Sequence, residues 1–294
     1  MAAVIHRRTF RVRSYECDAY GHVNNANYLR YMQEAALDAS AAVGYDEARY
    51  TALGHIWLIR ETKIEYLRPL RFGDSVEVTT WVADFRRVRS RRLYELRNSA
   101  DQQIVAKGLT DWVYIERASG RPARVPPEMV TAFIPDADDL ATEAEARDPF
   151  PAAPPPPPGA FTMQRQVEWR DIDVEQHVNN ATYLNYIEEC GILAAAAFGW
   201  PTKRIESEGF AIVAREHRIE YKQQATLGDK LLVTTYLSEL RRATATRHYQ
   251  IMREDGTLIA QARSLWVFVN LATGGIMRLP SVFLEDFTRH IAAG

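Results

Sequence analysis

One segment of the chain occurs twice, and this repeat constrains the fold more than any other feature. Residues 18–29 and 173–184 share the pattern Asp-x-x-x-His-Val-Asn-Asn-Ala-x-Tyr-Leu, 155 residues apart. Later pairs keep this separation: Glu65 with Glu220, Gly73 with Gly228 and Arg86 with Arg241. Trp112 and Trp266 are 154 apart, so one residue is lost, in the turn near Asn98 or near Asp255. A register held this long predicts two copies of one domain, each too long for a solenoid repeat.

The segment between the copies has the composition of a linker. Residues 136–160 begin with acidic residues and contain a run of prolines from Pro154 to Pro158. Consecutive prolines favour a stiff polyproline II spacer, although they can also be the ligand of a proline-binding domain. The predicted organisation is an N-terminal domain at 1–135, the linker at 136–160 and a C-terminal domain at 161–294. A length of 294 residues fits two domains.

Composition narrows the class of protein. The net charge of −2 gives no general attraction to nucleic acid. The two cysteines, Cys17 and Cys190, supply neither a disulfide framework nor metal-ligand spacing, which indicates a reducing compartment. The first ten residues lack the apolar stretch of a signal peptide, and the longest apolar run, 191–200, is too short to cross a bilayer. We therefore expect a cytoplasmic protein that binds neither membrane nor nucleic acid.

Residue periodicity predicts the same elements in both copies. In the first copy we expect a strand at 9–15, a helix at 26–43 that stops at Gly44, and strands at 56–67, 75–85, 92–98 and 104–116. The helix of the second copy is expected at 181–198. The order strand, long helix, four strands favours an α+β fold, with an antiparallel sheet packed on one helix.

The repeated motif places chemically useful groups before each helix. Asp18 and Asp173 each precede a histidine by four residues, His22 and His177. A carboxylate can activate water or attack a thioester, and the free N–H groups of a helix N-terminus can stabilise the resulting oxyanion. Asp and Asn at such positions are also common turn formers and caps, but their occurrence twice in register favours a site. No further histidine or cysteine has metal-ligand spacing, so a metal site is not expected.

The motif resembles that of the hotdog thioesterases, both the 4-hydroxybenzoyl-CoA thioesterase-like group and the acyl-carrier-protein thioesterases. Residues 171–180 are especially similar to the latter. The resemblance implies a tandem, or double, hotdog, in which each sheet wraps around one long helix. The site residues that it implies are catalytic Asp173, His177, Asp18 and His22, main-chain oxyanion donors at Asn180 and Asn25, and supporting Asn179, Asn24, Glu175 and Gln224.

The chain also departs from the plant-type pattern. Tyr20 and Glu175 stand where those enzymes have an asparagine, and Pro69 and Gln224 stand where they have a glutamate. The incomplete set favours chemistry centred on the aspartate, closer to the bacterial group. Cys17 has only an isoleucine as its counterpart, so we expect a buried neutral thiol rather than a nucleophile.

Arginines gather after the third predicted strand and recur in the second copy. Guanidinium groups suit the phosphate of coenzyme A or of a carrier protein, although a charge run is also typical of a solvated hairpin. The candidate phosphate ligands are Arg87, Arg89, Arg91, Arg241 and Arg242.

These features together predict a thioesterase that hydrolyses acyl-CoA or acyl-ACP without a cofactor. Relatives of this kind build sites between two copies, so we expect two equivalent sites, the second favoured, in a pseudo-dimer whose sheets pair edge to edge. Further homo-oligomerisation stays open. The alternatives are a hotdog hydratase or dehydratase, whose usual proline beside the histidine is missing here, and a non-catalytic acyl-thioester binding module, which would not need the carboxylates.

Overall fold

The computed structural model describes residues 3–135, 147–288 and 291–292, and the chain divides into two compact units. Unit 1 comprises residues 1–149 and unit 2 residues 150–294. The predicted linker falls partly outside the described residues, at 136–146; its described part, 147–160, contains neither helix nor strand. None of the described helices is long and apolar enough to cross a membrane.

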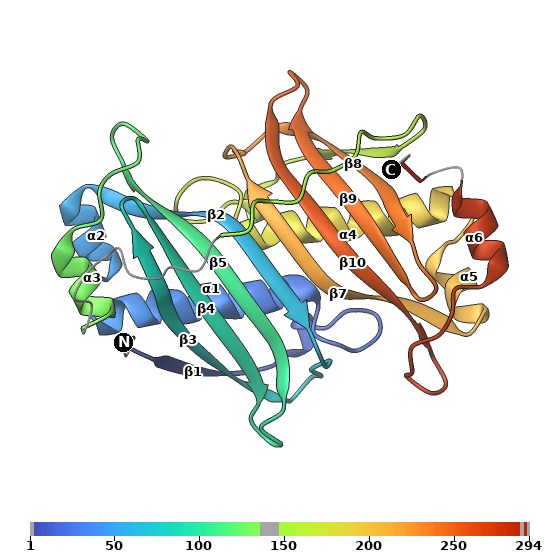
Figure 1. Ribbon diagram of the computed structural model, residues 1–294, viewed down its shortest axis with the longest axis horizontal. Helices are drawn as coiled ribbons and strands as arrows, with labels where there is room; N and C mark the ends of the chain where they lie inside the picture. Colours follow the sequence, from blue (N-terminus) through green and yellow to red (C-terminus); the bar gives the residue numbers. More distant parts are fainter. Residues whose placement is uncertain (1–2, 136–146, 289–290, 293–294) are drawn as a thin grey trace. The chain divides into compact units, whose positions relative to one another are not determined.

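Unit 1 is a five-stranded antiparallel sheet with one long helix, α1, against a face (Figure 1). The strand order is β1-β3-β4-β5-β2. Its strands are β1 (His6–Arg11), β2 (His55–Tyr66), β3 (Ser75–Arg86), β4 (Arg89–Asn98) and β5 (Ile104–Glu116), and its helices are α1 (Asn25–Ala42), α2 (Glu47–Leu53) and α3 (Pro127–Phe133).

Unit 2 repeats this arrangement in the same chain order, with strand order β7-β10-β9-β8-β6. The predicted α+β fold is therefore confirmed in both copies. Its strands are β6 (Phe161–Gln166), β7 (Phe210–Tyr221), β8 (Lys230–Leu240), β9 (Thr244–Arg253) and β10 (Leu258–Asn270), and its helices are α4 (Asn180–Ala197), α5 (Thr202–Ser207) and α6 (Ser281–Thr288).

Small residues let the long helix approach the sheet. In unit 1, Ala26, Ala35 and Ala39 are buried on α1. Gly108 on β5 lies so close to the helix that a Cβ there would be 2.5 Å from Met32. Since interiors are packed to crystal density, a larger residue at this position would force the end of the Met32 side chain to move.

The first strand and the loop before each long helix differ from the prediction. The first strand covers residues 6–11 rather than 9–15, and the chain then turns into a short 3-10 helix, η1 (Ser14–Glu16). Glu16 causes the difference, because its carboxylate accepts a hydrogen bond from Arg13 N at 2.7 Å and closes the turn. Unit 2 has the equivalent η2 (Trp169–Asp171).

Other boundaries agree more closely with the sequence. The hairpin brings β4 forward to Arg89, three residues before its predicted start, and the helix runs from 25 to 42 instead of 26 to 43. The lost residue lies where it was expected: residues 99–103 connect β4 to β5, and the shorter 254–257 connects β9 to β10. Residue periodicity did not predict the short helices α2, α3, α5 and α6. Aromatic residues of two of them, Phe133 of α3 and Phe283 of α6, belong to the two cores.

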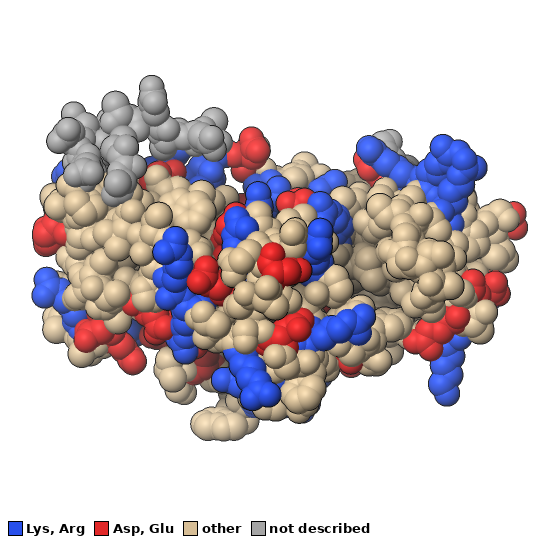
Figure 2. Space-filling view, turned by 90° about the horizontal axis from the view of Figure 1, so that it is seen from below, with Lys and Arg blue, Asp and Glu red and all other residues tan. Residues whose placement is uncertain are grey.

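Charged side chains of both signs are interspersed on the face drawn in Figure 2. This mixture agrees with the small net charge of the sequence.

Candidate active site

A buried carboxylate anchors the motif loop in each unit. In unit 1, Glu16 accepts a hydrogen bond from the hydroxyl of Tyr31 at 2.7 Å; in unit 2, Asp171 accepts one from Tyr186 at the same distance. Burial and the adjacent carboxylate raise the pKa of both tyrosines, so they remain protonated donors. Each loop is thereby tied to the middle of its long helix.

A second set of bonds ties the loop of unit 2 to the segment after β7. Val178 N donates to Ala225 O at 2.8 Å, and Ala225 N donates to the hydroxyl of Tyr183 at 3.3 Å. The hydroxyl of Tyr221 donates to Asn180 O at 3.1 Å. Unit 1 repeats all three bonds, with these counterparts: Val23, Leu70, Tyr28, Tyr66 and Asn25. The main-chain frame of the motif is therefore the same in both units.

The aspartate of unit 1 is held as a turn residue. Asp18 is exposed, and its Oδ1 accepts from Tyr20 N at 2.9 Å and His22 N at 3.1 Å. Burial, and next to it Arg71, lower the pKa of His22, so its imidazole is neutral near pH 7. Among the described residues, the buried Nε2 of His22 has no hydrogen-bond partner.

The aspartate of unit 2 has a side-chain partner and less exposure to solvent. Asp173 Oδ1 accepts from Glu175 N at 3.0 Å, and Oδ2 accepts from the amide of Asn179 at 3.3 Å. The side chains of Asp173 and His177 are 21% and 15% exposed, with Nδ1 of the histidine 3.9 Å from Oδ1 of the aspartate. These two groups are close, but not in direct hydrogen-bond contact.

The start of α4 completes this arrangement. Asn179 caps the helix, since its Oδ1 accepts from Ala181 N at 3.0 Å, and its amide holds Asp173. In the described part of the chain, no hydrogen bond uses the main-chain N–H of Asn180, the first residue of the helix. That N–H carries the positive end of the helix dipole and is available to an anionic oxygen. In unit 1, Asn24 caps α1 in the same way.

Gln224 and Pro69 lie on exposed segments beside the motif loops. Gln224 precedes Ala225, and its main-chain oxygen accepts a hydrogen bond from Arg253. The structure does not bring the Gln224 side chain into hydrogen-bond contact with Asp173 or His177. Glu175 contributes its main-chain N–H to Asp173.

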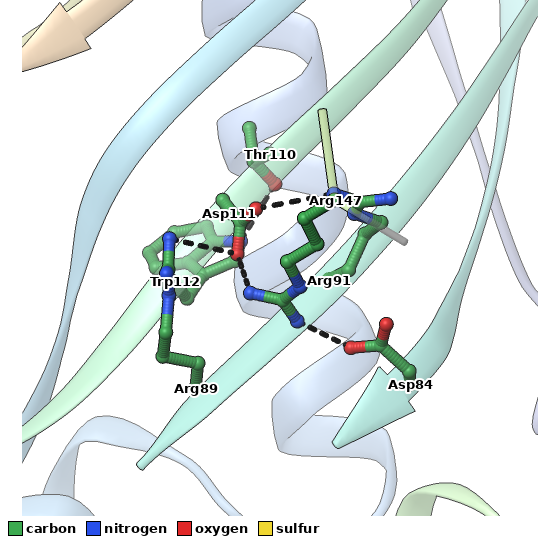
Figure 3. A network of polar contacts seen from close by, with 7 residues as sticks. All are labelled: Asp84, Arg89, Arg91, Thr110, Asp111, Trp112 and Arg147. Carbon is green, nitrogen blue, oxygen red and sulfur yellow. Dashed lines mark hydrogen bonds and ion pairs between the residues drawn. The ribbon is translucent and has the colours of Figure 1, made fainter. Parts of the chain in front are cut away.

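Two of the five candidate phosphate arginines face the buried carboxylate of Asp111 (Figure 3). Arg91 and Arg89 lie 3.5 Å and 3.7 Å from the buried Asp111. Arg147, from the segment after 146, binds Asp111 and also Asp84. The other three candidates, Arg87, Arg241 and Arg242, are exposed, and Arg241 lies 3.2 Å from the exposed carboxylate of Glu239.

The two cysteines differ in exposure, and the described residues form no cluster of metal ligands. Within the described ranges, no group of three or more His, Cys, Asp or Glu side chains is placed to hold a metal. Cys17 is half-buried rather than buried as expected, because it lies on the loop surface beside η1. Cys190 is buried on α4, and burial raises its pKa to about 12, so it is a neutral thiol.

The sequence analysis missed the buried anchors Glu16 and Asp171. Their signal was present, because acidic residues stand 155 apart there and tyrosines, Tyr31 and Tyr186, follow each of them by fifteen residues. A carboxylate and a phenol at one spacing in two copies indicate a shared contact, which the motif alone did not reveal.

Comparison with known sequences agrees with the repeat. The model of the thioesterase-like superfamily matches residues 12–133 and again residues 167–287. The palmitoyl-acyl carrier protein thioesterase of Cuphea hookeriana is 23% identical over 282 residues, which cover 93% of this chain and 65% of that protein. The oleoyl-acyl carrier protein thioesterase 1 of Arabidopsis thaliana is 24% identical, covering 89% of this chain and 75% of that protein.

Solved structures share the fold. The 12:0-ACP thioesterase of Umbellularia californica has a TM-score of 0.68 at 23% identity, and covers 89% of this chain and 93% of its own. An acyl-ACP thioesterase of Bacteroides thetaiotaomicron has the same TM-score at 16% identity, with 89% and 97% covered. Both units thus have the predicted hotdog fold, and the chain belongs to the thioesterase-like superfamily as a tandem of two of its domains.

Proposed function

We propose that the chain hydrolyses acyl thioesters and that unit 2 carries the principal site. The observation that supports this most strongly is Asp173, a partly buried carboxylate held by Asn179 next to an α4 N-terminus whose first N–H has no partner among the described residues. The family of the chain agrees with this chemistry.

The proposed reaction uses these groups in complementary roles. The Asn180 N–H polarises the thioester carbonyl and stabilises the oxyanion. Asp173 either takes the proton of a water that attacks the carbonyl carbon, or attacks that carbon itself. In the first route the C–S bond of the tetrahedral intermediate breaks, the acid is released and the thiolate takes up the proton held by Asp173. In the second route C–S cleavage leaves a mixed anhydride on Asp173 and a thiolate, and water then hydrolyses the anhydride to the acid, its second proton going to the thiolate. His177, 3.9 Å from the aspartate, orients the water or the carboxylate. Asp18 and His22 form the equivalent pair of unit 1, with weaker support because Asp18 is exposed and accepts hydrogen bonds from main-chain N–H groups of its own turn.

The thiol carrier is proposed to be acyl carrier protein, with coenzyme A as the alternative. The support is that relatives along most of this chain are named for acyl carrier protein. Of the five arginine candidates, we retain the exposed Arg87, Arg241 and Arg242 for the phosphate that both carriers share, since Arg89 and Arg91 face the buried Asp111.

The experiment is a hydrolysis assay with a free-thiol readout, using one acyl chain on both carriers. We expect thiol release from both and a higher kcat/KM for the carrier-protein substrate. Equal kcat/KM values for the two carriers would contradict the preference for acyl carrier protein but would still show that the chain hydrolyses thioesters. Product analysis separates the alternatives: water addition or loss without thiol release would identify a hydratase or dehydratase, and binding without turnover would identify a binding module.

A further inference from the structure

A narrow loop carries Asp173, and the base of this loop is formed by Asp171 and Asn179. Asn179 N donates a hydrogen bond to Asp171 O at 2.9 Å, and nearer the tip Asp173 N donates to His177 O at 3.0 Å. An antiparallel bridge pairs the two residues between these bonds. The position of Asp173 therefore depends on the base of the loop, where Asp171 is bonded to the N-cap of α4.

The carboxylate of Asp171 holds this base against α4. Only 5% of the residue is exposed. Its Oδ2 accepts hydrogen bonds from the Tyr186 hydroxyl at 2.7 Å and from Glu168 N at 2.9 Å, and it lies 3.6 Å from the guanidinium of Arg165. Hydrogen bonds to an ionised carboxylate are stronger than those between neutral groups. Since Tyr186 lies within α4, this bond fixes the loop to the helix.

Asn179 connects the base of the loop to the groups of the proposed reaction. Its Oδ1 accepts a hydrogen bond from Ala181 N at 3.0 Å, so the side chain is fixed to the first turn of α4. Its amide donates to Asp173 Oδ2 at 3.3 Å. Along the chain it directly precedes Asn180, whose N–H is the proposed oxyanion donor. The carboxylate and the oxyanion donor of the proposed site therefore share one support, which is Asn179.

We infer that Asp171 and Tyr186 are positioning residues for hydrolysis. Through Asn179 they fix the place of the Asp173 carboxylate relative to the first N–H of α4. The inference rests on the proposed function for the roles of that carboxylate and that N–H. Asp171 and Tyr186 act through Asn179 and not on the thioester, so their contribution is to geometry, where a misplacement of about 1 Å can lower the rate roughly 10²-fold.

Tyr186→Phe tests the inference, because it removes the hydroxyl and keeps the ring. The full chain is assayed by thiol release from the dodecanoyl thioester of the better carrier. We expect kcat to fall about 10-fold and KM to change less than about 2-fold, because the lost bond orients groups that act in the transition state. In the Asp173→Asn background the same substitution should change kcat less than about 2-fold, since residues that act as a unit are not additive.

Tyr236→Phe is the matched control in the same unit. Tyr236 is a buried tyrosine on β8, outside the motif loop, and its hydroxyl donates to Pro154 O at 2.6 Å. This variant should keep the wild-type kcat, and melting temperatures check that both variants are folded in the assay. The inference is overturned if Tyr186→Phe keeps the wild-type kcat, if Tyr236→Phe lowers kcat equally, or if Tyr186→Phe causes the same fold-loss with and without Asp173→Asn.

A second measurement does not depend on hydrolysis. In proton–nitrogen NMR spectra, the side-chain amide resonances of Asn179 report its hydrogen bond to Asp173. These resonances should shift in Tyr186→Phe and stay in place in Tyr236→Phe. Unshifted resonances in Tyr186→Phe would show that the hydroxyl does not position Asn179, and would overturn the inference. A chain that shows the shift but hydrolyses no thioester would keep the positioning of Asp173 and overturn the proposed function alone.

Discussion

Units 1 and 2 share the main-chain hydrogen bonds of the motif and differ in the groups that bind the motif aspartate. Both anchor the loop through a buried carboxylate and a tyrosine, at 2.7 Å in each. In unit 2 the motif aspartate, Asp173, accepts a hydrogen bond from the amide of the helix cap Asn179, and in unit 1 Asp18 accepts hydrogen bonds from main-chain N–H groups of its own turn. A duplicated motif thus keeps the same main-chain frame in both copies, while the hydrogen-bond donors to its aspartate differ between them.

The largest expected effect concerns the two aspartates. Asp173→Asn should lower kcat by roughly 10²–10⁴-fold, the usual contribution of a general base, while the fold persists. Asp18→Asn should have a much smaller effect, since Asp18 is exposed. Steady-state kinetics of both single variants and the double variant measure this. Equal losses of kcat in the two single variants would show that both sites hydrolyse the substrate. Wild-type kcat in the double variant would show that both aspartates serve only as turn residues.

The second prediction concerns two histidines that only unit 2 buries in its sheet. Burial lowers the pKa of His217 to about 3 and that of His248 to about 4. Above pH 6.5, the pKa of histidine in the unfolded chain, both histidines are neutral in the folded and in the unfolded chain. As the pH falls below 6.5, the unfolded chain binds protons at these histidines and the folded chain does not. Stability should therefore fall between pH 6.5 and about 4, by up to about 1.4 kcal/mol per pH unit for each histidine.

The matched variants copy unit 1. His217→Thr and His248→Leu introduce the residues found at positions 62 and 93. Urea unfolding followed over pH 4–7 should show a shallower dependence on pH for each variant. An unchanged slope would mean that the histidines are protonated in the folded state, contrary to their burial.

The third prediction concerns a cluster that only unit 1 has. Arg147 binds Asp84 and Asp111, whereas unit 2 has a leucine, Leu265, at the position of Asp111 (Figure 3). Arg147→Met should destabilise the chain by about 1–3 kcal/mol, less than for an isolated buried pair because Arg89 and Arg91 remain near Asp111.

Scanning calorimetry measures this as a lower melting temperature. The exposed Arg241→Met is the control and should be nearly silent, since surface ion pairs contribute little. Equal melting temperatures for the two variants would show that Arg147 does not stabilise unit 1.

The smallest expected effect concerns the exposed arginines. Arg87→Gln, and separately the pair Arg241→Gln and Arg242→Gln, should raise KM for acyl-CoA about 2- to 5-fold, as expected for solvent-exposed charges. A truncated thioester without the nucleotide should be unaffected, and Arg121→Gln, another exposed arginine, serves as the control variant. If the truncated thioester responds equally, the arginines support the hairpin and do not bind phosphate.

The sequence by itself determined the duplication, the element order and the location of the motif. These follow from local pattern: a register of 155 residues, the alternation in strands such as β3, and an asparagine cap followed by an alanine-rich helix. The sequence did not predict the turn after the first strand. That strand covers residues 6–11 because the carboxylate of Glu16 accepts a hydrogen bond from Arg13 N and closes the turn.

Only the tertiary structure decided which candidates have partners. Asp111 lies twenty residues from Arg91 and 36 from Arg147, and no local pattern joins them. The hydroxyl of Thr110 forms hydrogen bonds with Tyr94 and Trp112, whereas the hydroxyl of its counterpart Ser264 pairs with His217. The sequence of their own strand does not show this difference in partners, because the cross-strand neighbour is Thr62 in unit 1 and His217 in unit 2. Hydrogen bonds form between groups that the fold brings within about 3 Å of one another. Sequence periodicity predicts which face of a helix or strand a side chain lies on and whether it is buried, but it does not predict the distance between two side chains.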